Sequence, residues 1–184
     1  MLDELWSAAT RHPFLDAVRE GTITDAAFDR WLLQDAVFVA DLLTFQARLL
    51  ARSPRSAQSV IAGGCVALVE ELDWFEVHTA RRGIDPDPPA LPATLAYRDL
   101  LQRLDSAPYA AAVTALWVLE RVYLLAWTTA ISAGSPFKEF IEHWTDPGFA
   151  AYVDALGELA TDGHDDLVAD VLAHEVAFWD MALT

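Results

Sequence analysis

Three carboxyl side chains stand where the helical spacing of the sequence predicts an apolar core. Asp35, Glu120 and Glu175 each lie three or four positions from large aromatic or aliphatic residues, so each shares a helix face with them. An ionised carboxylate buried without partners is strongly unfavourable. We therefore expect a polar pocket in the core. Apolar surroundings would raise the pKa of Glu175 toward the range of a general acid or base.

Asp35 and Phe38 indicate how such a pocket could hold a ligand. A carboxylate pairs in a bidentate manner with the ring nitrogen and exocyclic amine of an aminated heterocycle, and Phe38, one turn further on, offers a ring for stacking. The alternative for Asp35 is an acid at the core edge that pairs with an arginine or with water. For Glu175 the alternative is a salt bridge to one of three arginines, Arg30, Arg48 or Arg121.

Further polar residues accompany the three acids. Tyr123 lies about one turn from Glu120 on the most aromatic helix and could hydrogen-bond in the same pocket. Glu71 and His78 share a face of another helix, and with Glu120 and His143 they form a possible nitrogen and oxygen ligand set for a metal. The sequence contains no HExxH motif, cysteine cluster, EF-hand loop, Gly-rich phosphate loop or GxSxG elbow.

The elements that must position these residues are helices. Hydrophobic residues recur with helical periodicity, without strand-like alternation or a solenoid repeat. Cap and turn signals predict helices over residues 2–20, 25–52, 54–82, 94–105, 108–133, 136–144, 147–160 and 165–183, with a possible break of the first at His12-Pro13. The proline-rich stretch 84–93 reads as a loop within one domain. We expect a single all-α domain over residues 1–184, a bundle of seven or eight helices.

Composition narrows the classes of function. The 184 residues carry a net charge of −16, which repels nucleic-acid phosphates and anionic membranes. The sequence has no uninterrupted run of about 18 apolar residues, so we expect no membrane-spanning helix. The N-terminus lacks a signal-peptide pattern, and the single cysteine, Cys65, excludes an internal disulfide, so we expect a cytoplasmic protein with no membrane or nucleic-acid partner. The 54% hydrophobic content fits a helical core plus buried subunit interfaces.

Three segments in fixed order carry a family resemblance. They are HPFLDAVREGTITDAAFDRWLLQDAVFVADLLTF (residues 12–45), EFIEHWTDPGF (139–149) and HEVAFWDMA (174–182). Together they resemble the TenA (thiaminase II, TENA/THI-4) family. The resemblance implies a heme-oxygenase-like α-bundle that binds no heme, a homo-oligomer (dimer or tetramer), and salvage of thiamine by hydrolysis of aminopyrimidine precursors or of thiamine itself, with no cofactor.

The resemblance also implies roles for individual residues. Asp35 corresponds to the aspartate that holds the aminopyrimidine, and Glu175 to the acid/base on the last helix. Phe38 stands where a tyrosine is common, and Trp144 where a pocket tyrosine usually lies. The expected substrate-binding set is Asp35, Phe38, Glu71, Tyr123, Trp144 and Phe178.

The main departure from the family concerns the nucleophile. Thiaminase-competent members place a reactive cysteine on the helix that here reads ALWVLERVY, which has none. This helix resembles a subgroup in which glutamate replaces that cysteine, with Glu120 and Tyr123 as counterparts. Without a thiolate, covalent attack on the pyrimidine methylene is disfavoured, whereas Glu120 and Glu175 could carry out direct hydrolysis. We therefore predict hydrolysis of an amino- or formylaminopyrimidine derived from thiamine.

Two alternatives remain open at this point. A heme-oxygenase-like di-iron oxidase would use Glu71, His78, Glu120 and His143 as part of its ligand set. A non-catalytic binding or regulatory protein would keep the pocket without turnover, as the missing cysteine and the missing tyrosine hydroxyl at Phe38 suggest.

Overall fold

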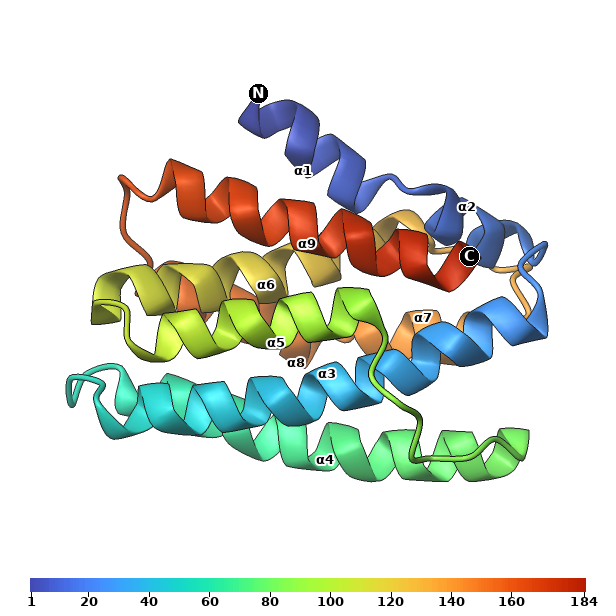
Figure 1. The fold of residues 1–184 in the computed structure, drawn as a ribbon, viewed down its shortest axis with the longest axis horizontal. Helices are drawn as coiled ribbons and strands as arrows, with labels where there is room; N and C mark the ends of the chain where they lie inside the picture. The colour runs from blue at the N-terminus through green and yellow to red at the C-terminus, as the bar shows by residue number, and fades with distance from the viewer.

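The computed structural model describes all 184 residues and folds them into nine helices without a strand (Figure 1). The helices are α1 (Leu2–Thr10), α2 (Pro13–Glu20), α3 (Asp25–Ala51), α4 (Gln58–Arg82), α5 (Pro92–Asp105), α6 (Tyr109–Thr129), α7 (Lys138–Trp144), α8 (Pro147–Gly157) and α9 (Asp165–Leu183). The count exceeds the predicted seven or eight because the helix predicted over residues 2–20 is divided into two helices, α1 and α2. The connection between α4 and α5 covers residues 83–91, so α5 begins within the predicted loop of residues 84–93, because Pro92 occupies its first helical position.

Local chemistry explains where the N-terminal helices begin and end. The His12 side chain accepts a hydrogen bond from the Phe14 N–H, and Pro13 occupies the first helical position, so α2 starts anew there. Gly21 ends α2 in the left-handed conformation, with φ of 70°. Thr24 then caps α3 by accepting from the Ala27 N–H at 3.2 Å.

The helices form a layered bundle. α3 packs against α4 and α5, α6 packs against α8 and α9, and α1 lies across α9 and α6 (Figure 1). The long antiparallel pair α3–α4 and the central helix α6 thereby enclose the middle of the molecule. Since polar side chains on these helices face inward, the bundle can surround a small molecule on several sides.

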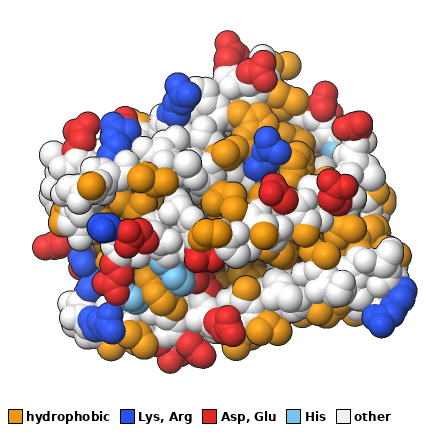
Figure 2. Space-filling model, turned by 180° about the vertical axis from the view of Figure 1, so that it is seen from behind, with side chains coloured by type: hydrophobic (Ala, Val, Ile, Leu, Met, Phe, Trp, Pro, Cys, Tyr) orange, Lys and Arg blue, Asp and Glu red, His pale blue; other side chains and the backbone are white.

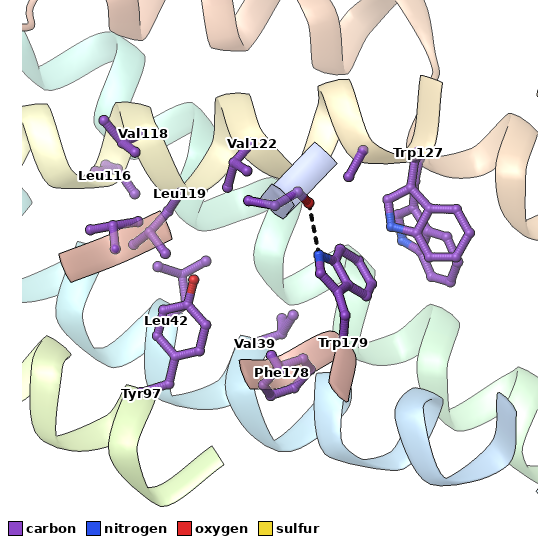
Figure 3. Close-up of a cluster of buried hydrophobic side chains, with 14 of the residues drawn as sticks. Val39, Leu42, Tyr97, Leu116, Val118, Leu119, Val122, Trp127, Phe178 and Trp179 are labelled. Carbon is purple, nitrogen blue, oxygen red and sulfur yellow. Dashed lines mark hydrogen bonds between the residues drawn. The ribbon is translucent and has the colours of Figure 1, made fainter. Parts of the chain in front are cut away.

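Three tryptophans join the helices at the centre of the core. Trp31, Trp127 and Trp179 are fully buried, and their ring centroids lie 5.1 to 6.1 Å apart. The Trp179 indole N–H donates to the Ala9 carbonyl at 3.0 Å, which ties α9 to α1 (Figure 3). Figure 3 shows Val39, Leu42 and Phe178 packed in the same region. This rigid aromatic core supports the elements around the cavity.

α6 is the most apolar of the long helices. Its 21 residues have the length and composition of a membrane-crossing helix, but 61% of its most apolar window is buried within the bundle. That burial is typical of a core helix.

Candidate active site

A cavity of about 830 Å³ lies among α3, α4, α6, α7, α8 and α9. Most of the predicted site residues line it: Asp35, Phe38, Glu71, Glu120, Tyr123, Trp144 and Glu175. Phe178 does not reach the cavity surface. It packs behind the wall, with its ring centroid 5.9 Å from those of both Phe38 and Tyr97. Phe178 therefore supports the wall from behind, and its contact with a substrate stays a prediction.

Asp35 is held by a tyrosine and by no cation. It is 3% exposed, and the Tyr123 hydroxyl donates to its Oδ2 at 2.9 Å. Burial raises the pKa of Asp35 well above its usual range, which the Tyr123 hydrogen bond only partly offsets. No arginine pairs with Asp35, so the alternative of an arginine-paired acid at the core edge does not hold. Burial therefore favours the neutral form of Asp35.

Glu175 also faces a tyrosine, one that the sequence analysis did not identify. The Tyr97 hydroxyl on α5 donates to Glu175 Oε2 at 2.7 Å. Burial raises the pKa of Glu175 to about 7, and the hydrogen bond from Tyr97 acts in the opposite direction. The arginines considered as alternative partners are engaged elsewhere: Arg30 with the Ala182 carbonyl, Arg48 with Asp105, and Arg121 over the Trp117 ring.

Glu120 is the one of the three acids that no protein group holds in place. It is 8% exposed and has no hydrogen-bond or ionic partner in the protein. Burial, together with the charge of Glu71, raises its pKa to about 8. Glu120 is therefore a mostly neutral carboxylic acid at pH 7, which can donate a hydrogen bond into the cavity.

Glu71 is fixed by two donors from α7. Its Oε2 lies 2.6 Å from His143 Nε2, and its Oε1 accepts from the Trp144 indole N–H at 2.8 Å. The His143 ring stacks parallel on Trp74, with centroids 4.1 Å apart. Both Glu71 oxygens thus have protein partners, and the charge of Glu71 contributes to the raised pKa values of Asp35 and Glu120.

The ligand set considered for a di-iron centre is not assembled. His78 does not line the cavity and instead packs against Trp74, with its Nε2 3.7 Å from Glu139 Oε1. No group of three or more His, Cys, Asp or Glu side chains is placed to hold a metal ion. The hypothesis of a centre built from Glu71, His78, Glu120 and His143 is therefore wrong in its geometry.

The lining is acidic and carries no Lys or Arg. Seven carboxyl side chains contribute to it: Asp35, Glu70, Glu71, Glu120, Glu142, Asp146 and Glu175. On the face that contains α6, α7 and α8, Figure 2 shows histidine side chains beside acidic and hydrophobic ones. Such a cavity favours ligands that are cationic or rich in hydrogen-bond donors.

Fold and site together define a helical-bundle protein built around an acidic, aromatic cavity. The chain belongs to the TENA/THI-4/PQQC family, whose family model matches residues 1–184. At the level of the family, this membership supports a hydrolase of thiamine metabolism.

Individual relatives agree with this membership. The chain is 33% identical to a protein of Glycine max named "Probable bifunctional TENA-E protein", in an alignment that covers 97% of this chain and 88% of that one. A solved TenA homologue from Pyrococcus furiosus is 27% identical, with a TM-score of 0.88 and coverage of 98% and 95%. A TenA family transcription regulator from Silicibacter sp. TM1040, 22% identical over 98% and 92% of the chains, shares the fold with a TM-score of 0.90. The predicted heme-oxygenase-like fold is confirmed.

Proposed function

We propose that the protein hydrolyses a C–N bond of an amino- or formylaminopyrimidine derived from thiamine, with carboxyl groups in place of a thiolate. One observation carries the proposal: Asp35, fixed by Tyr123, shares a single cavity with Glu120 and Glu175, whose pKa values burial raises to about 8 and about 7. Two carboxyl groups with pKa values near neutrality can exchange protons with a reacting substrate. Similarity to the protein named TENA-E supports the same class of reaction.

Asp35 is suited to bind the pyrimidine. A neutral carboxyl group donates through its O–H to a ring nitrogen and accepts from the neighbouring amine, so the pair forms without a buried net charge. Tyr123 holds the carboxyl group in place through Oδ2. The Phe38 ring, which packs on Tyr97 at a centroid distance of 4.6 Å, offers an apolar face to the heterocycle.

Glu175 is suited to move the proton. With a pKa of about 7, it is ionised in a large fraction of molecules at neutral pH and can take a proton from water. It then returns that proton to the leaving nitrogen. For a formylamino compound the products are formate and the amine; for an aminomethyl compound they are the alcohol and ammonia. In both reactions one water is consumed and the C–N bond is broken.

The test is incubation of the purified protein with both pyrimidines, with formate and ammonia measured separately. Glu175→Gln and Glu120→Gln should each lower the rate at least about 100-fold, the lower end of what general acid–base catalysis contributes. Glu76→Gln, an exposed change on α4, serves as the control. If both cavity variants keep the full rate, the assignment of the chemistry is wrong. Tight binding by wild type with no product over hours would favour the non-catalytic binder instead.

We also propose that the protein assembles as a dimer or tetramer. Three exposed apolar side chains share one face of α4: Val66, Val69 and Val77. Sedimentation velocity of the wild type and of Val69→Lys tests this: a charged residue on a buried subunit interface should shift the protein toward monomer.

A further inference from the structure

Tyr152 on α8, which lines the cavity together with Tyr123, receives a hydrogen bond whose direction the structure determines. The Gln46 side-chain Nε2 donates to Tyr152 Oη at 2.9 Å and to the Ile61 carbonyl at 2.9 Å. Gln46 is fully buried. Turning its amide over would place Oε1 against the Ile61 carbonyl oxygen, two acceptors facing each other, so the nitrogen must be on this side.

The hydroxyl hydrogen of Tyr152 is consequently left without a protein acceptor. Tyr152 Oη accepts from Gln46 and therefore must direct its own O–H elsewhere, and it donates no hydrogen bond to any protein group. Burial, followed by the charge of Glu120, raises the pKa of Tyr152, so the phenol stays protonated. Because Tyr152 lines the cavity, this free donor is available to a bound molecule.

Gly64 on α4 makes the arrangement possible. A Cβ at this position would lie 2.1 Å from Gln46 Nε2 and 2.2 Å from Tyr152 Oη, so one of these side chains would have to move. Gly64 thus leaves the space in which side chains from α3 and α8 meet. Three helices contribute to the placement of one hydroxyl group, which is typical of a group held for binding or catalysis.

We propose that Tyr152 donates a hydrogen bond to the formyl oxygen of a bound formylaminopyrimidine, and that Gln46 and Gly64 are its positioning residues. The inference rests on the proposed hydrolysis and selects the formylamino compound as the substrate that uses this part of the cavity. An aminomethyl compound has no oxygen at the scissile group and gains nothing from such a donor. Glu120, whose charge affects Tyr152, supplies a second donor when it is neutral.

The proposed hydrolysis of the formylamino group forms one C–O bond and breaks one C–N bond. Water, losing a proton to Glu175, attacks the formyl carbon, and the C=O electron pair moves onto the oxygen. Tyr152 stabilises that developing negative charge, as oxyanion-hole donors do in acyl transfer. The intermediate collapses, the C–N bond breaks, and the nitrogen takes the proton from Glu175. Formate and the free amine result.

Tyr152→Phe removes the donor and keeps the ring. With the formylamino compound we expect kcat to fall about 100-fold, the cost of losing one oxyanion donor. We also expect KM to rise about tenfold, because the hydrogen bond to the bound formyl oxygen is lost as well. With the aminomethyl compound the rate should stay close to wild type. Tyr109→Phe is the matched control, because Tyr109 lies at the start of α6 and outside the cavity lining. Wild-type kcat and KM for Tyr152→Phe on the formylamino compound would overturn the proposal.

Gly64→Ala tests the positioning without touching the phenol. The added methyl group must displace Gln46 or Tyr152, so this variant should lose formate release selectively, as Tyr152→Phe does. Gly63→Ala, one residue earlier on α4, places a Cβ that meets no atom within 4 Å. It supplies the same gain in helix propensity and controls for thermal stability. A Gly64→Ala protein with wild-type formate release would show that these contacts do not position the hydroxyl.

A calorimetric titration separates failure of this inference from failure of the proposed function. If wild type binds the formylamino compound but releases no formate, the proposed hydrolysis fails. Tenfold weaker binding by Tyr152→Phe than by Tyr109→Phe would then still support the donor, and equal binding would overturn it. If wild type neither binds nor cleaves the compound, both proposals are wrong.

Discussion

The Tyr97 hydroxyl donates to Glu175 Oε2 at 2.7 Å and so joins α5 to α9 at the wall of the cavity. The hydrogen bond occupies one carboxyl oxygen, while Glu175 Oε1 has no protein donor. Tyr97 therefore restricts the rotation of the carboxyl group and leaves one oxygen for water or substrate. This geometry is suited to a general base.

Tyr97→Phe should shift the pH dependence of the reaction. The Tyr97 hydrogen bond lowers the pKa of Glu175, so its removal raises that pKa, by about one unit for a hydrogen bond to a charged group. Less Glu175 is then ionised at pH 7, and the limb of kcat/KM that requires the ionised form moves to higher pH. A pH–rate profile measures this. Loss of activity at every pH without a shift would assign Tyr97 a structural role only.

Glu120→Gln should stabilise the folded protein in alkaline solution. Burial raises the folded-state pKa of Glu120 to about 8, above the ordinary value of 4.5, so between these values the folded protein holds a proton that the unfolded chain has lost. Wild-type stability therefore falls as pH rises through this window. Glutamine does not titrate and avoids this loss. Relative to wild type, the free energy of unfolding of the variant should therefore be higher by on the order of 4 kcal/mol at pH 8 and by little at pH 5.

Urea unfolding at pH 5 and pH 8 checks this prediction. Glu76→Gln, exposed on α4, should show little difference between the two pH values. An equal effect of Glu120→Gln at both pH values would indicate that Glu120 is already ionised in the folded protein.

The sequence predicted the fold and the location of the cavity because both depend on regular spacing. Asp35, Glu120 and Glu175 lie on apolar helix faces in the sequence, and the structure buries all three around one cavity. Family motifs around the first and last of these acids add their expected roles. Helix ends followed from local cap and proline signals, as at His12-Pro13.

The hydrogen-bond partners were much harder to predict. Tyr97 looks like an ordinary core residue of an amphipathic helix, and only the packing of α5 on α9 brings it to Glu175. Tyr152 and Gln46 are 106 positions apart and meet only where Gly64 leaves room. Phe178 was expected in the pocket because it follows Glu175 by three positions, but its ring faces Phe38 and Tyr97 from behind the wall. Sequence periodicity predicts on which face of a helix a residue lies, but it does not predict which residue of another helix that side chain contacts.

Asp35→Asn should mainly weaken binding. In the proposed pairing, Asp35 Oδ2 accepts from Tyr123 and donates to the ring nitrogen, while Oδ1 accepts from the amine. Asparagine has one acceptor oxygen, so keeping it on the Tyr123 hydroxyl turns its NH2 group toward the amine, where two donors meet. We expect the Kd for an aminopyrimidine to rise about 10- to 100-fold, equivalent to about 1.4 to 2.8 kcal/mol. Tyr123→Phe, which only frees the carboxyl group, should cost less. Calorimetry measures both, and an unchanged Kd for Asp35→Asn would place the heterocycle elsewhere.

The charge of the cavity predicts discrimination against phosphorylated pyrimidines. Seven carboxyl groups and no Lys or Arg line it, and Glu70 and Glu142 are exposed there. A phosphate dianion gains no cation on entry and is repelled by the ionised acids. At separations of several ångströms near a protein surface, this repulsion amounts to about 1 to 2 kcal/mol, or roughly tenfold in affinity.

The Kd values of a hydroxymethylpyrimidine and its phosphate ester, compared at low and high salt, test this prediction. The ester should bind about tenfold more weakly at low ionic strength, and added salt should narrow the difference because it screens the exposed acids. The Glu70→Gln/Glu142→Gln double variant should also narrow the difference in Kd, because it removes two exposed charges from the cavity. Glu76→Gln, exposed on α4, should leave the difference unchanged. Equal affinity for both compounds at low salt would mean that the phosphate remains in solvent, outside the field of the ionised cavity acids, and that the cavity charge does not select the substrate.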